Sequence, residues 1–135
     1  MAKPQQVTFL KTAIDDKPGA MLGVAQLLKG RKLSLTGMWG YATREGRADL
    51  FLIAKNPEKL RAALSAEGMP LEQGTAFFLK GTDTAGALVK TMDALAGAGV
   101  NVIAMNAVAV SGKFGSFIWV ADADVAKTAA ALGRK

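Results

Sequence analysis

The sequence repeats itself at an offset of 67 residues. Residues 16–64 align with residues 83–131 without a gap and are identical at 10 of 49 positions. Among the identities, Asp16, Gly19, Ala20, Leu28, Gly30 and Met38 fall on Asp83, Gly86, Ala87, Leu95, Gly97 and Met105. The repeat predicts two copies of one structural unit. A chain of 135 residues, half of them apolar, suits one compact unit or two very small units that share a core.

Each copy shows the same succession of hydrophobic patterns. A strand precedes a helix whose apolar residues recur at helical spacing and which ends near a glycine. A second strand then leads through a polar, glycine-bearing turn into a third strand. The expected strands are 7–14, 33–43 and 50–53 in the first copy, and 76–80, 100–111 and 117–120 in the second. In the repeat alignment, the apolar third-strand run of the first copy falls on that of the second.

A second helix follows in each copy. Asn56 suits the N-cap, Pro57 the first helical position and an acidic residue the first turn. Asp124 is the expected cap in the second copy. Residues 69–73 can add a closing strand to the first copy, but the second copy has no such segment. We therefore expect a sheet edge without a partner there, which proteins usually cover.

These patterns predict an α+β fold of two ferredoxin-like βαββαβ units, 1–73 and 74–135. The second unit lacks a clear last strand, and the helices lie on one face of antiparallel sheets. The other face of such a sheet is usually polar, yet 50–54 and 117–121 are apolar at successive positions. Burying a residue such as Phe51 contributes roughly 2–3 kcal/mol. We therefore expect another protomer to cover this face, with sheets side by side or in a face-to-face homodimer.

The sequence contains neither cysteine nor histidine, which excludes most catalytic and metal-binding chemistry. Disulfides, thiol nucleophiles, most zinc sites and Ser-His-Asp triads need these residues. A general base would have to be Asp, Glu or Lys, and the repeated acids stand at expected helix starts. Ser111 and Ser116 have no evident activating partner. We expect no enzymatic activity, no cofactor and no metal, since a metal held by carboxylates alone has little support.

The formal net charge of +6 is concentrated in the first half of the sequence. Residues 1–67 carry +5, and residues 68–135 carry +1. Scattered basic residues with interleaved acids are more typical of a solvated face than of a nucleic-acid surface. The polar residues 1–6 are followed by no apolar leader, and the longest apolar stretch, 102–110, is too short to span a bilayer. These features favour a soluble, cytoplasmic protein.

Matched turns precede the first helix of each copy, at residues 15–20 (DDKPGA) and 83–87 (DTAGA). A helix start exposes unpaired N–H groups and a partial positive charge, which suit a carboxylate. The matched glycines lack a Cβ and would let a ligand approach the backbone. The alternative is structural: Asp16 and Asp83 cap the helices, and the glycines permit the turns.

The pattern Asp-x-Pro-Gly, then a helix, a glycine and an apolar-Asn-apolar strand resembles the ACT domain, a small amino-acid-sensing module of βαββαβ form. The resemblance covers nearly the whole chain, twice. The first copy has the better turn, 16–19, and the second copy has the better strand, 100–102. Each departs where the other fits, since Ala85 replaces the proline and Ser34 the asparagine. The resemblance implies a tandem ACT-like regulatory or sensor protein without an attached catalytic domain.

The resemblance also implies that an amino acid binds between the first turn of one unit and the second strand of a neighbouring unit. The turn would hold the α-carboxylate, and residues of the strand would recognise the side chain. Met38, Trp39 and Met105 could adapt to a ligand or pack in a core, and Asn106 could bond a strand neighbour or the ligand. The implied ligand-binding residues are Asp16, Lys17, Pro18, Gly19, Ala20, Met21, Ser34, Met38, Asp83, Gly86, Ala87, Asn101, Met105 and Asn106.

Two other functions compete with ligand sensing. A structural or interaction module would keep the fold and assemble through its apolar sheet face. An RNA-binding protein of this topology would carry alternating aromatic residues on its third strand. Phe114 and Phe117 are three apart and face opposite sides, whereas Phe117 and Trp119 share a face that is typical of a core or an interface.

Taken with the resemblance to the ACT domain, these observations lead us to expect an amino-acid ligand, a homo-oligomer and a regulated enzyme as partners. We expect neither a membrane nor nucleic acid as a partner.

Overall fold

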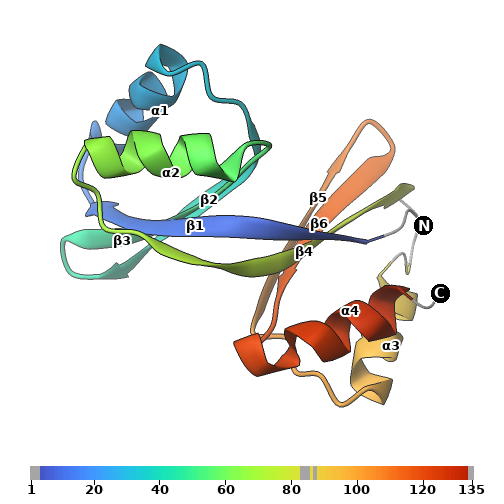
Figure 1. Ribbon diagram of the computed structural model, residues 1–135. Helices are drawn as coiled ribbons and strands as arrows, with labels where there is room; N and C mark the ends of the chain where they lie inside the picture. Colours follow the sequence, from blue (N-terminus) through green and yellow to red (C-terminus); the bar gives the residue numbers. More distant parts are fainter. Residues whose placement is uncertain (1–3, 83–85, 87, 134–135) are drawn as a thin grey trace. The chain divides into compact units, whose positions relative to one another are not determined.

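The computed structural model describes residues 4–82, 86 and 88–133 (Figure 1). The strands are β1 (Gln5–Asp15), β2 (Leu35–Arg44), β3 (Arg47–Ala54), β4 (Glu72–Thr82), β5 (Ala104–Val110) and β6 (Lys113–Trp119). The helices are α1 (Ala20–Gly30), α2 (Pro57–Ala66), α3 (Val89–Gly97) and α4 (Val125–Gly133), with a short 3-10 helix at Asp122–Asp124. The predicted α+β fold with antiparallel strand pairs is confirmed. Within the described ranges, no helix is long and apolar enough to cross a membrane.

The chain divides into two compact units that both draw on β1 and β4. The first unit is Thr8–Gly74, and the second unit combines Thr75–Lys135 with Met1–Val7. The hydrogen-bonded strand order is β2-β3-β1-β4 in the first unit and β1-β4-β6-β5 in the second. Both orders are typical of a βαββαβ sheet, in which the hairpin lies on one side of the first strand.

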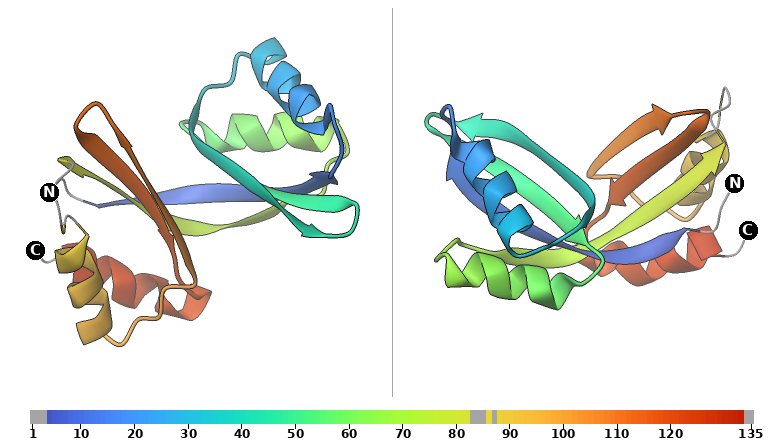
Figure 2. Two further views of the ribbon diagram at one scale, coloured as in Figure 1. Left: turned by 180° about the vertical axis from the view of Figure 1, so that it is seen from behind. Right: turned by 90° about the horizontal axis from the view of Figure 1, so that it is seen from above.

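In the first unit, α1 and α2 cover one face of the strands (Figures 1 and 2). The register pairs Leu10 with Leu52, so both side chains lie on the helix-bearing face together with Leu50. The buried cluster on this face is completed by Val24 and Leu28 of α1, Ala54 of β3, and Leu60 and Leu64 of α2. Burial of each large apolar side chain contributes roughly 2–3 kcal/mol, so this cluster is the main source of stability.

The second unit packs α3 and α4 against its strands in the same way. Phe77 pairs with Ile118, as Leu10 pairs with Leu52 in the first unit. The buried cluster consists of Phe77, Leu79, Leu95, Val100, Ile118, Val120 and Leu132. The repeat in the sequence is therefore a repeat of core positions.

The second strands of the two copies pair differently. β2 shows register shifts between Leu35 and Gly37 and between Ala42 and Arg44, whereas β5 pairs with β6 without a shift. At the second shift, the bulged residue, Thr43, is an insertion of the first copy, and equivalent positions lie 66 rather than 67 apart after it. The ungapped alignment of 50–53 with 117–120 is therefore wrong. A slip of one residue along a strand moves every side chain to the opposite face.

β4 serves as an edge partner in both units. The closing strand that was expected at 69–73 begins only at Glu72 and runs on as the continuous strand β4. In the first unit, Phe9 of β1 lies so close to Gly74 that an added Cβ would come within 2.7 Å of the phenyl ring. In the second unit, residues 5–7 of β1 supply the neighbour of β4. The chain's own first strand thus covers the edge that was expected to lack a partner.

The start of α2 confirms the sequence signature. Asn56 Oδ1 accepts a hydrogen bond from the backbone N–H of Lys59 at 3.1 Å, and Pro57 is the first helical residue. Glu58 lies in the first turn. In the second unit, Asp124 directly precedes α4 and forms an ion pair with a lysine one turn on. Its role as a cap stays a prediction.

The ends of α1 and α3 are alike. Both helices end on the predicted glycines, Gly30 and Gly97, and the left-handed residue follows two positions later. That residue is Lys32 in the first unit, with φ of 55°, and Gly99 in the second, with φ of 74°. In each unit the next N–H donates a hydrogen bond back to a helix carbonyl at 2.9 Å. This bond closes the helix end in both copies.

The strand face opposite the helices carries aromatic residues in both units. In the first unit, Trp39 stacks on Phe51 with ring centroids 5.6 Å apart. Lys11 Nζ lies 5.7 Å from the centroid of the same Phe51 ring. In the second unit, Phe78 stacks on Phe117 at 4.5 Å. Aromatic neighbours thus cover part of this face within one chain, and its burial by a second protomer stays a prediction.

Candidate functional site

The first-copy turn leaves the N-terminus of α1 open. Gly19 is the N-cap with φ of +91°, and an added Cβ there would meet nothing within 4 Å. No side chain of the described residues caps the helix, so the structural alternative in which Asp16 caps it is wrong. Ala20 N–H donates to a turn carbonyl at 3.3 Å, but no backbone acceptor is found in the described ranges for Met21 or Leu22. Free N–H groups and the helix dipole therefore make this end attractive to an anion.

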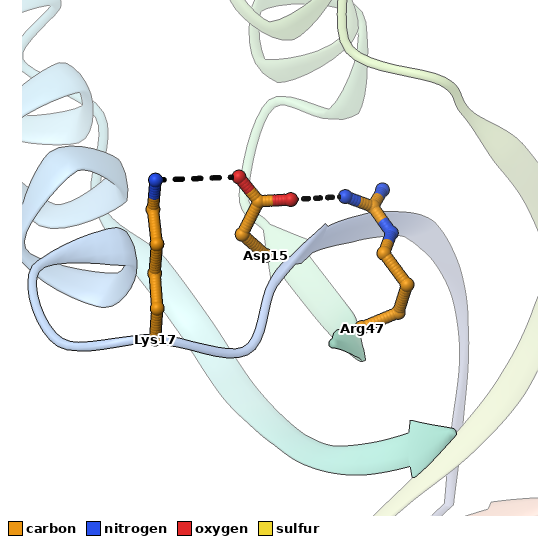
Figure 3. A network of polar contacts seen from close by, with 3 residues as sticks. All are labelled: Asp15, Lys17 and Arg47. Atoms are coloured by element: carbon orange, nitrogen blue, oxygen red, sulfur yellow. Dashed lines mark hydrogen bonds and ion pairs between the residues drawn. The ribbon is translucent and has the colours of Figure 1, made fainter. Parts of the chain in front are cut away.

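Two cations hold the carboxylate that precedes the turn (Figure 3). Arg47 Nη1 lies 2.6 Å from Asp15 Oδ1, and Lys17 Nζ lies 3.6 Å from Oδ2. Arg47 is also the cross-strand partner of Asp15, and the N–H of Asp16 donates to Gly46 O at 3.0 Å. The three charged side chains are exposed, so each ion pair contributes about 1 kcal/mol or less. Their main effect is to fix the turn against the β2–β3 hairpin.

The matching turn of the second copy is built differently. Asp83 and Ala87 lie outside the described residues. Gly86 has φ of +76°, and a Cβ there would contact the side chain of Val89 at 3.6 Å. α3 begins at Val89 with Leu88 as its N-cap, although the repeat would start it two residues earlier. The glycine N-cap that opens α1 is therefore a feature of the first copy.

The candidate residues of the second strands are exposed. Met38 and Met105 are 41% and 39% exposed at equivalent positions on the helix-bearing faces of β2 and β5. Neither methionine belongs to a core, so the core-packing interpretation is wrong for both. Ser34 and Asn101, which stand just before these strands, are exposed as well. Trp39 points to the opposite face of β2 from Met38.

Asn106 uses its side chain within the sheet. Its Oδ1 accepts a hydrogen bond from the backbone N–H of Phe117 at 3.1 Å, and its carbonyl accepts one from Ser116 Oγ at 2.7 Å. Of the two alternatives for this residue, the bond to a strand neighbour is therefore the one that the structure supports. The buried hydroxyl of Ser116 is occupied in this way.

The turn and the start of the second strand are not adjacent within one unit. α1 has 11 residues and so measures about 16 Å at 1.5 Å per residue. It separates Gly19 at its start from Ser34, which follows its end. Residues 16–21 are contiguous and form one candidate surface, whereas Ser34 lies near the other end of α1.

The first unit also contains a cavity that the sequence analysis did not single out. Its volume is about 400 Å³, and it lies among the end of β1, the β2–β3 hairpin and residues 70–72. The charged residues of its wall are Lys11, Arg44, Arg47, Asp49 and Glu72. They come from four different strands, so no local motif or spacing could have identified them. Within the described ranges, no three Asp or Glu residues gather in a way that could hold a metal ion.

No protein-family model and no curated protein matches the sequence. Solved structures do match it over nearly the whole chain. Protein BT0572 from Bacteroides thetaiotaomicron has a TM-score of 0.83 and 20% identity, and the match covers 97% of this chain and 89% of that one. The ligand-free regulatory subunit of aspartate kinase from Thermus thermophilus has a TM-score of 0.64 and 20% identity, with 96% and 92% covered. The corresponding subunit from Thermus flavus has a TM-score of 0.58 and 17% identity, with 97% and 95% covered.

At these identities the likeness concerns the fold. The chain has an ACT-like α+β fold, and two of the structures similar to it are regulatory subunits of aspartate kinase.

Proposed function

We propose that this chain is a regulatory or sensor protein that binds a small amino acid and has no catalytic activity of its own. Its fold supports the proposal, because similar folds occur in regulatory subunits of aspartate kinase. The absence of histidine and cysteine from the sequence fits a binding role better than a catalytic one. We propose further that it acts in the cytoplasm, as a homo-oligomer, on an enzyme whose activity responds to that amino acid.

The open start of α1 is the observation that carries this proposal. The helix has no acidic residue in its first turn and no side-chain cap. An α-carboxylate placed there would accept hydrogen bonds from the free N–H groups of Met21 and Leu22. It would also lie at the positive end of the helix dipole. Gly19, with open space at its missing Cβ, lets the carboxylate approach the backbone.

The rest of the site comes, in this proposal, from the second strand of a neighbouring unit. Such a strand is needed because α1 separates Gly19 from Ser34 within a single unit. The exposed hydroxyl of Ser34 or the amide oxygen of Asn101 can accept hydrogen bonds from an α-ammonium group. The exposed thioethers of Met38 and Met105 can adapt to the ligand's side chain.

A thermal-shift screen of the twenty amino acids tests the proposal. A ligand at 100 times its dissociation constant adds about 2.7 kcal/mol to the free energy of unfolding. One or a few amino acids should therefore raise the melting temperature of the full chain. If none of the twenty does so, the chain is not an amino-acid sensor of this kind.

A pair of glycine variants locates the site. Gly19→Val should abolish the ligand-induced shift, because its side chain blocks the carboxylate's approach. Gly68→Val is the matched control: Gly68 also has a positive φ, +71°, and open space at its Cβ, but it follows α2. Both variants place a β-branched residue at a positive φ, so a shift that survives in Gly68→Val but is lost in Gly19→Val comes from the turn. An unchanged shift in Gly19→Val would remove this turn from the proposal.

An interaction module without a metabolite is the second candidate, and the edge strand β5 favours it. Ala104–Val110 contains no charged residue, and Val108 and Val110 are 63% and 66% exposed. Edge strands usually carry charges or cover that prevent pairing with another chain. We propose that β5 pairs with a second copy of the chain in a homodimer.

Size-exclusion chromatography with light scattering tests this pairing. The wild-type chain should be a dimer at micromolar concentration, and Val108→Lys should shift it toward the monomer because it places a charge on the edge. Val89→Lys, at an equally exposed valine of α3, should leave the dimer intact. A monomeric wild-type chain would contradict the proposed pairing.

RNA binding has weaker support. Phe117 and Trp119 share a face of β6 but are only 7% and 8% exposed, and Phe114 is 8% exposed. Bases stack on accessible aromatic faces. The aromatic residues of this strand present little such surface.

A further inference from the structure

We propose that the cavity of the first unit is a second binding site, for a zwitterionic amino acid with an uncharged side chain. The site is distinct from the start of α1 and does not depend on the function proposed above. The cavity volume is about 400 Å³. It falls within the range of roughly 300–1,000 Å³ that is typical of small-molecule sites. An amino acid therefore fits.

Most charges of the cavity wall already have partners. Lys11 Nζ lies 3.5 Å from Asp49 Oδ2 on the neighbouring strand β3. Arg47 Nη1 lies 2.6 Å from Asp15 Oδ1, just outside the cavity lining (Figure 3). These groups neutralise one another and need no ligand charge.

One cation and one anion of the wall remain without a partner. Arg44 and Glu72 form no ion pair or side-chain hydrogen bond with any residue that the structure describes. A guanidinium binds a carboxylate through two parallel N–H groups, and a carboxylate accepts hydrogen bonds from an ammonium. The two free charges thus match the two charges of an α-amino acid.

The strand order sets these two residues on opposite sides of the cavity. Arg44 ends β2 and Glu72 begins β4, and β3 and β1 lie between these strands. Three strand spacings, at 4.8 Å each, set their backbones at least about 14 Å apart. Lys11 and Ala13 line the cavity from β1, between these two residues. In this proposal the amino acid lies above them, with its carboxylate toward Arg44 and its ammonium toward Glu72. Leu71 adds an apolar surface that suits an uncharged side chain.

The second unit indicates that the fold does not require these charges. With the one-residue insertion taken into account, Arg44 corresponds to Val110 and Lys11 to Phe78. The second unit keeps the same strand pairs with these apolar residues. The charges of Arg44 and Lys11 are therefore an addition of the first unit, as expected of a ligand site rather than of a structural element.

Nuclear magnetic resonance of the full ¹⁵N-labelled chain tests the inference, with glycine, L-alanine, L-valine and L-leucine as probes. At least one probe should shift the backbone amide resonances of residues 11–13, 43–47 and 71–72. L-Valinamide, which lacks the carboxylate, and N-acetyl-L-valine, which lacks the ammonium, should bind at least about tenfold more weakly than L-valine, since each loses a charge-assisted hydrogen bond. The cavity site is refuted if none of the four probes shifts these resonances, or if the two analogues bind as tightly as L-valine.

Charge-neutralising variants test which charge of the ligand Arg44 and Glu72 each bind. Arg44→Gln should weaken L-valine binding at least about tenfold and remove the preference over the amide, and Glu72→Gln should remove the preference over the N-acetyl analogue. Both side chains are exposed, so the fold should persist. Arg31→Gln, at an exposed arginine outside the cavity, should change nothing. Wild-type affinity in Arg44→Gln would overturn the assignment.

The two proposed sites can fail separately. An amino acid at the start of α1 would shift the resonances of residues 19–22 and would be lost in Gly19→Val. Binding in the cavity should survive Gly19→Val. Shifts confined to residues 19–22 would refute the cavity site and leave the proposed function standing, and shifts confined to the cavity would do the reverse.

Discussion

Replacement of Lys32 by glycine should stabilise the first unit. Lys32 has φ of 55°, in the left-handed region that L-residues rarely adopt. This conformation costs an L-residue roughly 1–2 kcal/mol. Glycine avoids that cost but gives up about 0.4–1 kcal/mol, because its unfolded state is more flexible. The net gain should be about 0.5–1 kcal/mol, which corresponds to a rise of about 2 °C in melting temperature for a chain of this size.

Two substitutions serve as matched controls, one at the equivalent residue of the second unit and one that removes the charge of Lys32. Gly99 is the equivalent residue, with φ of +74° and nothing within 4 Å of an added Cβ. Gly99→Lys should therefore destabilise the second unit by about 1 kcal/mol, through the backbone alone. Lys32 forms no ion pair with a described residue, so Lys32→Ala, which keeps the strained backbone, should not stabilise the chain as Lys32→Gly does.

The two tryptophans allow each unit to be followed separately. Trp39 lies in the first unit and Trp119 in the second. Urea unfolding monitored by fluorescence in a Trp119→Phe background reports the first unit, where Lys32→Gly should raise the midpoint without changing the slope. An equal stabilisation by Lys32→Ala would refute the backbone argument, because it would assign the effect to the charge.

Three further substitutions test the account of the core and the caps by the same unfolding assay. Thr12→Val should stabilise the chain by about 1 kcal/mol, because Thr12 Oγ1 is buried without a hydrogen-bond partner among the described residues; a loss of stability would indicate a partner for the hydroxyl. Ser116→Ala should instead cost about 1–2 kcal/mol, since it removes the 2.7 Å hydrogen bond that the buried hydroxyl donates to the Asn106 carbonyl. Asn56→Ala should cost about 1 kcal/mol through loss of the α2 cap, and Asn56→Asp, which can still cap, should recover most of it.

Local chemistry made the elements of each unit predictable. The start of α2 could be read from Asn56 and Pro57, since both act on the backbone next to them. The apolar periodicity of α1 and α3 and the hairpin turns are equally local. The α+β fold followed because the same short-range signals occur twice in the same order.

The features that sequence reasoning missed depend on residues far apart in the chain. The insertion of Thr43 could not be seen, because the third strands are mostly apolar on both faces and either register matches mainly apolar residues with one another. Residues 5–7 cover the edge of β4 from the other end of the chain. The charged wall of the cavity likewise brings Arg44 and Glu72 together from separate strands.

One core contact pairs a leucine with a small hydroxyl residue in both units, but the two strands exchange these residues. Thr12 of β1 pairs with Leu50, whereas at the equivalent positions Leu79 pairs with Ser116. The combined volume of the pair is thus constrained by packing, but the identity of either member is not. By the same comparison, what both units share is what the fold requires, such as the left-handed residue after the first helix. The open start of α1 and the unpaired Arg44 occur in the first unit alone, so ligand binding should respond to substitutions there and not at their counterparts in the second unit.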